Sequence, residues 1–309
     1  MNSLVTGGAG FIGSRLFDKL RQYGLVVAYD NLSSGSPSNI NKFLNGEHHL
    51  INGDITDLNR LCDAMSGIDV VFHLAANTNA RIGITYPDLD IQNGLMGTLS
   101  VLEAMVKTGV SKLVYASSCG IYGDDAVTPR DETYANPKPV CPYAFCKLAS
   151  ESLIRKFSKE HGIQAWIIRI GNAIGGGMTN GVILQLLEKL KGNPPVLKVL
   201  GSRKPSRPFF SVEDCADGII YAFNHSDERV NLFNIASSGS VNIGEIVDMM
   251  VDELGLDIPV EYEEQDRGWD GSAIEVNLIV DKINRLGWKA KLSPEEAVLK
   301  TIQEISAKE

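Results

Sequence analysis

The chain has 309 residues, is 44% hydrophobic and 22% charged, and carries a formal net charge of −9 spread along its length, so we expect a globular protein without a nucleic-acid partner. No apolar run approaches the roughly 18 residues of a membrane span, and the first run lacks a preceding basic region, so neither a membrane segment nor a signal peptide is expected. The five cysteines are odd in number and show no zinc spacing, which predicts reduced thiols, a cytoplasmic location and no metal site.

Up to about residue 171, short β-rich runs alternate with helical patterns. The β-rich runs are almost continuously apolar, which is typical of parallel strands covered by helices on both faces. The stretches between them are amphipathic, and two of them, 12–24 and 97–109, end in glycine, a common helix stop. The sequence therefore predicts an α/β fold built on a doubly wound parallel sheet. The expected strands are 3–6, 25–30, 49–53, 69–75, 112–118 and 165–170.

After residue 171 the alternation loosens into stretches rich in glycine, proline and lysine, followed by separate helical patterns. We expect a first domain over residues 1–171, to which segments near 208–236 return. We expect a smaller C-terminal α/β substrate domain over most of 172–309, closing over the carboxyl edge of the sheet. The helical patterns of this second part lie at 213–224, 242–254 and 294–306.

The first strand is followed by the glycine-rich stretch "VTGGAGFIGS", with Gly7, Gly8, Gly10 and Gly13, which opens an apolar helix. Glycines there allow a tight turn and a close approach to a pyrophosphate, which then lies on the helix N-terminus. Asp30 ends the second strand. A carboxylate at that place accepts hydrogen bonds from ribose hydroxyls and repels a 2′-phosphate. The pattern predicts a Rossmann-type sheet that binds NAD in preference to NADP.

Two Tyr-x-x-x-Lys patterns occur, Tyr134 with Lys138 and Tyr143 with Lys147. The pattern alone is a chance event, so its position has to decide. Three prolines in "YANPKPVCP" exclude a continuous helix between Tyr134 and Lys138. Tyr143 instead begins an apolar-faced helix, on which Lys147 lies one turn further along the same face. Only the second pair can therefore present both groups together.

The chemistry gives a reason for this pair. A phenol with a pKa of about 10 is a poor base at neutral pH. An ammonium group one turn away and a positively charged nicotinamide ring both favour the phenolate. Tyr143 could then take the proton of a sugar or alcohol hydroxyl, with Ser118, at the end of the fifth strand, hydrogen-bonded to the same oxygen.

The chain resembles the extended short-chain dehydrogenases/reductases, specifically the UDP-glucose 4-epimerase branch. The segments that carry this resemblance span essentially the whole chain in the family's order: "TGGAGFIGS", "DNLSSG", "HLAA", "SSCGIYG", "YAFCK", "RIGNAIGGG", "LGSRKPSRPFFSVEDCA", "FNIASSG" and "LGW".

The resemblance implies a tightly held NAD, a UDP-sugar substrate, and a homodimer formed through the helices at 94–108 and 142–157. The implied catalytic residues are Ser118, Tyr143 and Lys147. The implied cofactor contacts are Gly7, Gly10, Phe11, Ile12, Gly13, Asp30, Asn31, Ser34, Gly35, Asp54, Ile55, Leu74, Ala75, Ala76, Tyr143 and Lys147. The implied substrate contacts are Ser118, Asn172, Val182, Arg207 and Arg267, of which the two arginines and the amide suit a diphosphate.

The neighbours of Ser118 bear on the reaction. Family members that act as 4,6-dehydratases carry an acidic pair in the next two positions, and the sugar decarboxylases carry a glutamate there. Here these positions are Cys119 and Gly120, so elimination and decarboxylation lack their acid/base group. The resemblance therefore implies 4-epimerisation through transient oxidation at C4, with Cys119 more simply read as a buried inert thiol than as a proton donor.

Two departures from the family pattern concern the substrate. Ser272 stands where an aspartate is common, and the small Val276 falls near a pocket position that is bulky in epimerases restricted to plain hexoses. The small side chain favours UDP-GlcNAc and UDP-GalNAc as additional substrates.

Two other functions compete with the epimerase. The first is another nucleotide-sugar oxidoreductase or epimerase-reductase of the family, which would exchange its cofactor and produce NADH. The second is an NAD-sensing binding protein, since one fold hosts many functions. The second predicts loss of the serine, tyrosine or lysine, and all three are present.

Overall fold

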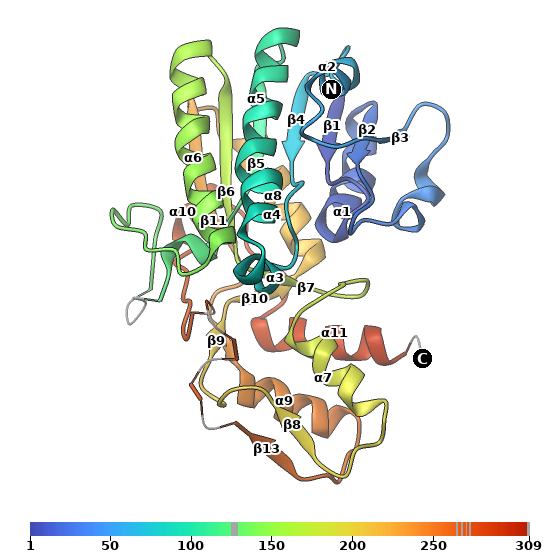
Figure 1. Ribbon diagram of the computed structural model, residues 1–309, viewed down its shortest axis with the longest axis vertical. Coiled ribbons are helices and arrows are strands. Elements are labelled where there is room, and N and C mark those ends of the chain that lie inside the picture. The colour runs from blue at the N-terminus through green and yellow to red at the C-terminus, as the bar shows by residue number, and fades with distance from the viewer. Residues whose placement is uncertain (125–128, 264, 267, 270, 272, 308–309) are drawn as a thin grey trace. The chain divides into compact units, whose positions relative to one another are not determined.

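A seven-stranded parallel sheet organises the computed structural model, which describes residues 1–124, 129–263, 265–266, 268–269, 271 and 273–307 (Figure 1). The strand order is β11-β6-β5-β4-β1-β2-β3, so the order reverses between β1 and β4, as in doubly wound folds that bind dinucleotides. The predicted fold class is confirmed. The strands are β1 (Ser3–Thr6), β2 (Val26–Asp30), β3 (His49–Asn52), β4 (Val70–His73), β5 (Lys112–Ser118), β6 (Gln164–Ile170) and β11 (Val230–Ile235).

The chain divides by its contacts into two units, each assembled from three separate stretches. Unit 1 comprises Met1–Ser118, Cys141–Arg169 and Ala216–Phe233. Unit 2 comprises Cys119–Val140, Ile170–Cys215 and Asn234–Glu309. Among the described residues, none of the helices is both long and apolar enough to cross a bilayer.

Successive residues of the strands face opposite sides of the sheet and are buried on both. On one side, Leu4 and Leu113 pack in a core with α2, α5 and α6. On the other, Phe72 meets Phe223 of α8 edge-on at a ring distance of 5.6 Å. Two-sided burial explains why the strands are apolar runs. The helices of this part are α1 (Phe11–Leu20), α2 (Leu58–Ala64), α3 (Ala80–Thr85), α4 (Pro87–Asp90), the π-helix Ile91–Met96, α5 (Gly97–Thr108), α6 (Pro142–His161) and α8 (Val212–His225).

Unit 2 has a separate core, in which α11 packs against α7, α9 and β10. Its helix α11 begins with a capping box between Ser293 and Glu296, which satisfies the first backbone N–H groups. Short paired strands complete it, among them β7 with β10 in parallel and β9 with β12 in antiparallel register. The elements are β7 (Asn172–Ile174), α7 (Val182–Leu190), β8 (Leu197–Val199), β9 (Ser206–Arg207), β10 (Phe209–Ser211), β12 (Val241–Asn242), α9 (Ile243–Glu253), β13 (Val260–Tyr262), α10 (Asp281–Leu286) and α11 (Pro294–Ser306).

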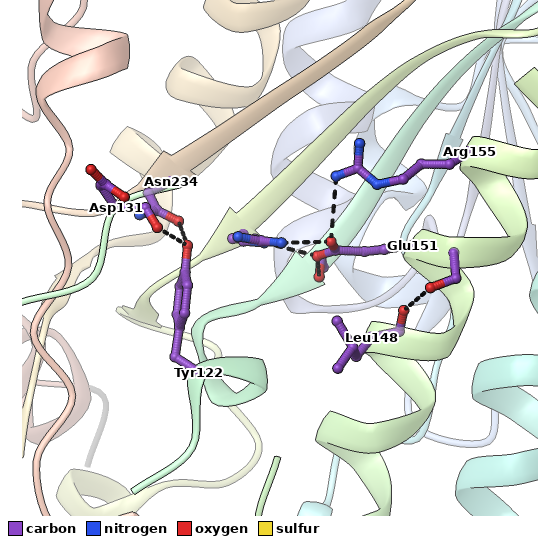
Figure 2. Close-up of polar contacts among 9 residues, drawn as sticks. Tyr122, Asp131, Leu148, Glu151, Arg155 and Asn234 are labelled. Carbon is purple, nitrogen blue, oxygen red and sulfur yellow. Dashed lines mark hydrogen bonds and ion pairs between the residues drawn. The ribbon is translucent and has the colours of Figure 1, made fainter. Parts of the chain in front are cut away.

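Two buried charges on one face of α6 attach this helix to the end of β5. The Lys147 ammonium donates to the carbonyl oxygen of Ala116 at 2.6 Å. Four residues further along α6, Glu151 accepts from the Ser117 hydroxyl at 2.6 Å and from Arg169 at 3.0 and 2.8 Å. Figure 2 shows the Glu151 carboxylate at the centre of this cluster, with Arg155 at 3.9 Å on its exposed side.

We expect Glu151→Ala to lower the free energy of unfolding by about 3–5 kcal/mol, because Arg169, only 4% exposed, would lose its buried counter-charge. Chemical denaturation measures this loss. The matched control is Glu160→Ala on the exposed part of the same helix, where the ion pair with Lys156 lies in solvent and little change is expected. Equal effects of the two substitutions would contradict the structural role given to Glu151.

Candidate active site

The loop between β1 and α1 is folded so tightly that glycine is required at both of its ends. Gly7 has φ +69° and packs against the backbone of Ala75, and the Gly10 amide donates to the Gly7 carbonyl at 3.0 Å. A Cβ on Gly13 would lie 2.0 Å from the Gly7 carbonyl oxygen. The helix therefore begins directly against the turn, without a side-chain cap on its N-terminal amides. This is the cradle that a pyrophosphate needs.

Asp30 connects this loop to the one that follows β2. Its carboxylate accepts hydrogen bonds from the amides of Ala9 at 3.0 Å and Leu32 at 2.8 Å. A Cβ on Gly35 would lie 2.8 Å from the same carboxylate, so the backbone passes close to it. The two donors leave acceptor capacity on a carboxylate, which has about four lone-pair sites. Of the residues predicted as cofactor contacts, Gly35 lies beside this group, and Asn31 and Ser34 belong to the same loop after β2.

The third predicted contact region follows β3 and β4. Asp54 accepts from Asn31 at 2.8 Å and from Thr56 at 2.9 and 2.6 Å. Burial works to raise the pKa of Asp54, but these hydrogen bonds outweigh it and lower the pKa below its usual value. The remaining predicted contacts are Phe11 and Ile12 in the first turn of α1, Ile55 buried after β3, and Leu74, Ala75 and Ala76 after β4. Together these carboxyl-end residues fit a dinucleotide.

The helix predicted at Tyr143 is present: α6 runs from Pro142 to His161, with the proline in its first turn. Tyr143 is half-buried, and the Lys147 nitrogen lies 5.7 Å from its ring centre. No helix joins Tyr134 and Lys138, as the prolines predicted. Ser118 is the last residue of β5, against which α6 packs. Serine, tyrosine and lysine thus lie on two elements that touch.

Lys147 is a buried cation, 3% exposed. Burial lowers its pKa to about 8, opposed by the negative charge of Asp90 and by Cys146 and Glu151. The buried ring of His73, at the end of β4, forms contacts of 2.7 Å with Thr6 and 3.1 Å with Thr98. Burial, reinforced by the charge of Lys147, lowers the pKa of His73 to about 3, so this imidazole is neutral. The site therefore holds its positive charge on Lys147.

Apart from Ser118, which ends β5 in unit 1, the predicted substrate contacts that the structure describes belong to unit 2. Asn172 begins β7, and its amide oxygen faces the Cys119 sulfur at 3.8 Å. Arg207, in β9, donates to the backbone carbonyls of Ser206, Ala273 and Ile274, and burial lowers its pKa. Val182 opens α7 and packs against the core of unit 2, while Val276 is buried. Arg267 and Ser272 lie outside the described residues.

A buried polar group joins the segment after Ser118 to two other parts of unit 2. The Tyr122 hydroxyl donates to the Asn234 side chain at 2.8 Å and to the Asp131 carbonyl at 3.1 Å, as Figure 2 shows. The Asn234 amide donates in turn to the carbonyls of Arg130 and Ile279, both at 3.0 Å. Asn234 thus holds three chain segments together.

The sequence reasoning missed three residues of this site: His73, Asp90 and Glu151. Glu151 continues the spacing of four that relates Tyr143 to Lys147, and this was a signal that could have found it. No sequence pattern indicated His73 or Asp90, whose place near the site becomes evident only from the folded structure.

The comparisons with known proteins agree on one family. Residues 3–236 match the model of the NAD dependent epimerase/dehydratase family. The chain is 32% identical to a putative UDP-glucose 4-epimerase of Methanocaldococcus jannaschii, over 97% of this chain and 96% of that protein. It is 29% identical to UDP-glucuronic acid decarboxylase 1 of Xenopus tropicalis, over 97% of this chain and 70% of that protein. A solved UDP-glucose 4-epimerase of Thermus thermophilus, in complex with NAD, is 28% identical with a TM-score of 0.87 over 99% of both chains.

We expect Gly13→Ala to lower NAD affinity on the order of tenfold or more, because the new Cβ would force the turn away from the Gly7 carbonyl. NAD content after acid release and calorimetric titration measure this. Gly192→Ala is the control, since a Cβ there meets nothing nearer than 3.9 Å. Unchanged NAD binding in Gly13→Ala would contradict the role of the loop.

The burial of Lys147 also predicts a pH dependence of stability. Between the folded pKa of about 8 and the unfolded value of 10.5, the unfolded chain binds the proton more strongly, so stability rises with pH through this window. Relative to Lys147→Met, the wild type should therefore gain on the order of 3 kcal/mol between pH 7 and pH 10.5.

Denaturation curves of the two proteins at several pH values test this, because groups whose pKa does not depend on Lys147 cancel in the difference. Lys138→Met, which removes the exposed lysine of the other Tyr-x-x-x-Lys pattern, should track the wild type at every pH. A flat difference between wild type and Lys147→Met would show that Lys147 titrates normally.

Proposed function

The chain belongs to the NAD-dependent epimerase/dehydratase family and uses NAD as its cofactor, and from this premise we propose that it catalyses the 4-epimerisation of a UDP-hexose. The observation that carries the proposal is the buried Lys147 cation beside Tyr143, on the helix that packs against the end of β5. The resemblance implies carboxylates after the active-site serine in dehydratases and decarboxylases, and this chain has Cys119 and Gly120 at those positions.

The chain's residues would share the work as follows. NAD, held by the glycine loop and Asp30, would supply a reversible hydride acceptor, so that C4 of the sugar could be oxidised and then reduced on its opposite face. Tyr143, as phenolate, takes the proton of the C4 hydroxyl and gives it back in the reverse step. Lys147 stabilises the phenolate by its charge, and Ser118 hydrogen-bonds the same sugar oxygen. Because proton and hydride both return, no net oxidation occurs.

The assignment of the ligands to the units is part of this proposal. Unit 1, with the glycine loop and Asp30, holds NAD. Unit 2 holds the nucleotide sugar through Asn172, Val182, Arg207 and Arg267. Its support is that the glycine loop and the Asp30 carboxylate fit a dinucleotide, and that a guanidinium matches a diphosphate.

The remaining predictions concern assembly and location. We propose a homodimer through α5 and α6, supported by large apolar side chains that are exposed beside these helices, including Met96, Val106 and Phe145, which is 61% exposed. A cytoplasmic location stays a prediction from the odd number of cysteines and their lack of zinc spacing.

The experiment is an incubation of the purified protein, without added cofactor, with UDP-glucose, UDP-GlcNAc and UDP-glucuronic acid in separate reactions, followed by proton NMR. We expect the galacto epimer of at least one sugar. UDP-xylose from UDP-glucuronic acid would make the protein a decarboxylase, and NADH accumulation on added NAD would make it an oxidoreductase.

We expect Tyr143→Phe to lower the epimerisation rate by about 10²–10⁴-fold, since the ring packing is kept and the proton acceptor is lost. The matched control is Tyr134→Phe, which keeps the ring over Arg130 and beside Tyr122. It should retain the wild-type rate. A rate loss in Tyr134→Phe equal to that in Tyr143→Phe would refute the assignment of the base.

A further inference from the structure

The active site contains a buried carboxylate to which the proposed mechanism gives no role. Asp90, the last residue of α4, is 1% exposed. One of its oxygens accepts from the Asn77 amide at 2.9 Å, and the other, Oδ2, is buried without a hydrogen-bond partner among the described residues. A Cβ on Gly83 would lie 1.8 Å from Oδ2, so the backbone of α3 closes over this oxygen. An anion enclosed in this way needs a compensating charge.

The helix that carries Lys147 lies beside this carboxylate, since α3, α4 and the following π-helix all pack against α6. The π-helix approaches α6 beside Lys147, since a Cβ on Gly94 would lie 3.2 Å from that of Cys146. Burial raises the pKa of Asp90 above its ordinary value, and the Asn77 hydrogen bond and the charge of Lys147 offset only part of this rise. No direct ion pair joins the described side chains of Asp90 and Lys147, so they interact through their charges at longer range.

The other groups around Lys147 do not supply the same charge. Glu151 is already neutralised by Arg169, at 2.8 Å, and by the longer contact with Arg155. Burial raises the pKa of the Cys146 thiol, so it is neutral near pH 7. The rings of Tyr115 and Tyr143 lie 4.8 and 5.7 Å from the ammonium, and His73 is neutral. Asn77 donates a hydrogen bond to Asp90, and the titratable groups whose charges interact with it are Cys141, Cys146 and Lys147.

We infer that Asp90 is a positioning residue of the active site, whose buried carboxylate keeps the Lys147 ammonium charged beside Tyr143. The effect of Asp90 on catalysis rests on the proposed function, whereas its charge interaction with Lys147 does not. Burial alone drives Lys147 toward its neutral form, and a neutral amine cannot stabilise a phenolate. Asp90 offsets part of that tendency without occupying the hydrogen bond of Lys147 to Ala116.

The test is a titration of the Lys147 side chain by carbon NMR in protein whose lysines are labelled at Cε. The Lys147 resonance is the one that is missing from the spectrum of Lys147→Met. Asp90→Asn keeps the size of the side chain and an acceptor for Asn77 while removing the charge. We expect it to lower the pKa of Lys147 by about one unit. Asp88→Asn, on the exposed face of the same short helix, is the matched control and should leave this pKa unchanged.

A reciprocal measurement covers the case in which Asp90→Asn fails to fold. In Lys147→Met, the carboxyl carbon of Asp90 should titrate at higher pH than in the wild type, because the stabilising cation is gone. An unchanged pKa of Lys147 in a folded Asp90→Asn, or of Asp90 in Lys147→Met, would overturn the inference.

Activity distinguishes this inference from the proposed function. In Asp90→Asn, the alkaline limb of the kcat profile should move down by about one pH unit, with KM little changed. A simple loss of rate at all pH values would assign Asp90 a structural role instead. If no epimer forms in the wild type, the proposed function fails while the NMR titrations still decide the interaction of Asp90 with Lys147.

Discussion

The arrangement of the site depends on two buried charges that project from one face of α6. Lys147 and Glu151 lie one turn apart, and their partners are a carbonyl and a hydroxyl at the end of β5. A buried charge without its partner costs several kcal/mol, so the helix cannot slide along the strand without losing one of them. Tyr143, on the same face, is thereby held at the strand end that carries Ser118. The burial that fixes the helix also works against the charge of Lys147, and this is where Asp90 becomes important.

Much of this arrangement could be predicted from local patterns. The six expected strands agree with the structure within two residues at each end, because strands buried on both faces are unbroken apolar runs flanked by polar turns. The glycine loop was predicted because glycines allow a tight turn, and the structure adds that a Cβ at Gly13 would have no room against Gly7. Tyr143 could be chosen over Tyr134 because proline excludes a helix regardless of tertiary context.

What could not be predicted depends on contacts between distant parts of the chain. The edge strand β11 carries Asn231 and Asn234, residues that disfavour strands, and both are satisfied by carbonyls elsewhere in the fold. Arg169 pairs with Glu151 only after β6 lies beside β5. Arg207 donates hydrogen bonds to the carbonyls of Ala273 and Ile274, more than 60 residues away, and no local sequence pattern predicts these partners. Asp90 looks like an ordinary residue of a short polar helix until the packing of α6 buries it.

The division of each unit into three separate stretches has a consequence for how the protein is made. Unit 1 acquires its last stretch, Ala216–Phe233, only after two of the three stretches of unit 2 have been synthesised, so neither unit can be completed early on the ribosome. A single recombination event between two relatives would also mix both units rather than exchange one. We therefore expect the two units to be inherited together, so that a change of substrate preference arises from substitutions within unit 2 instead of from its replacement.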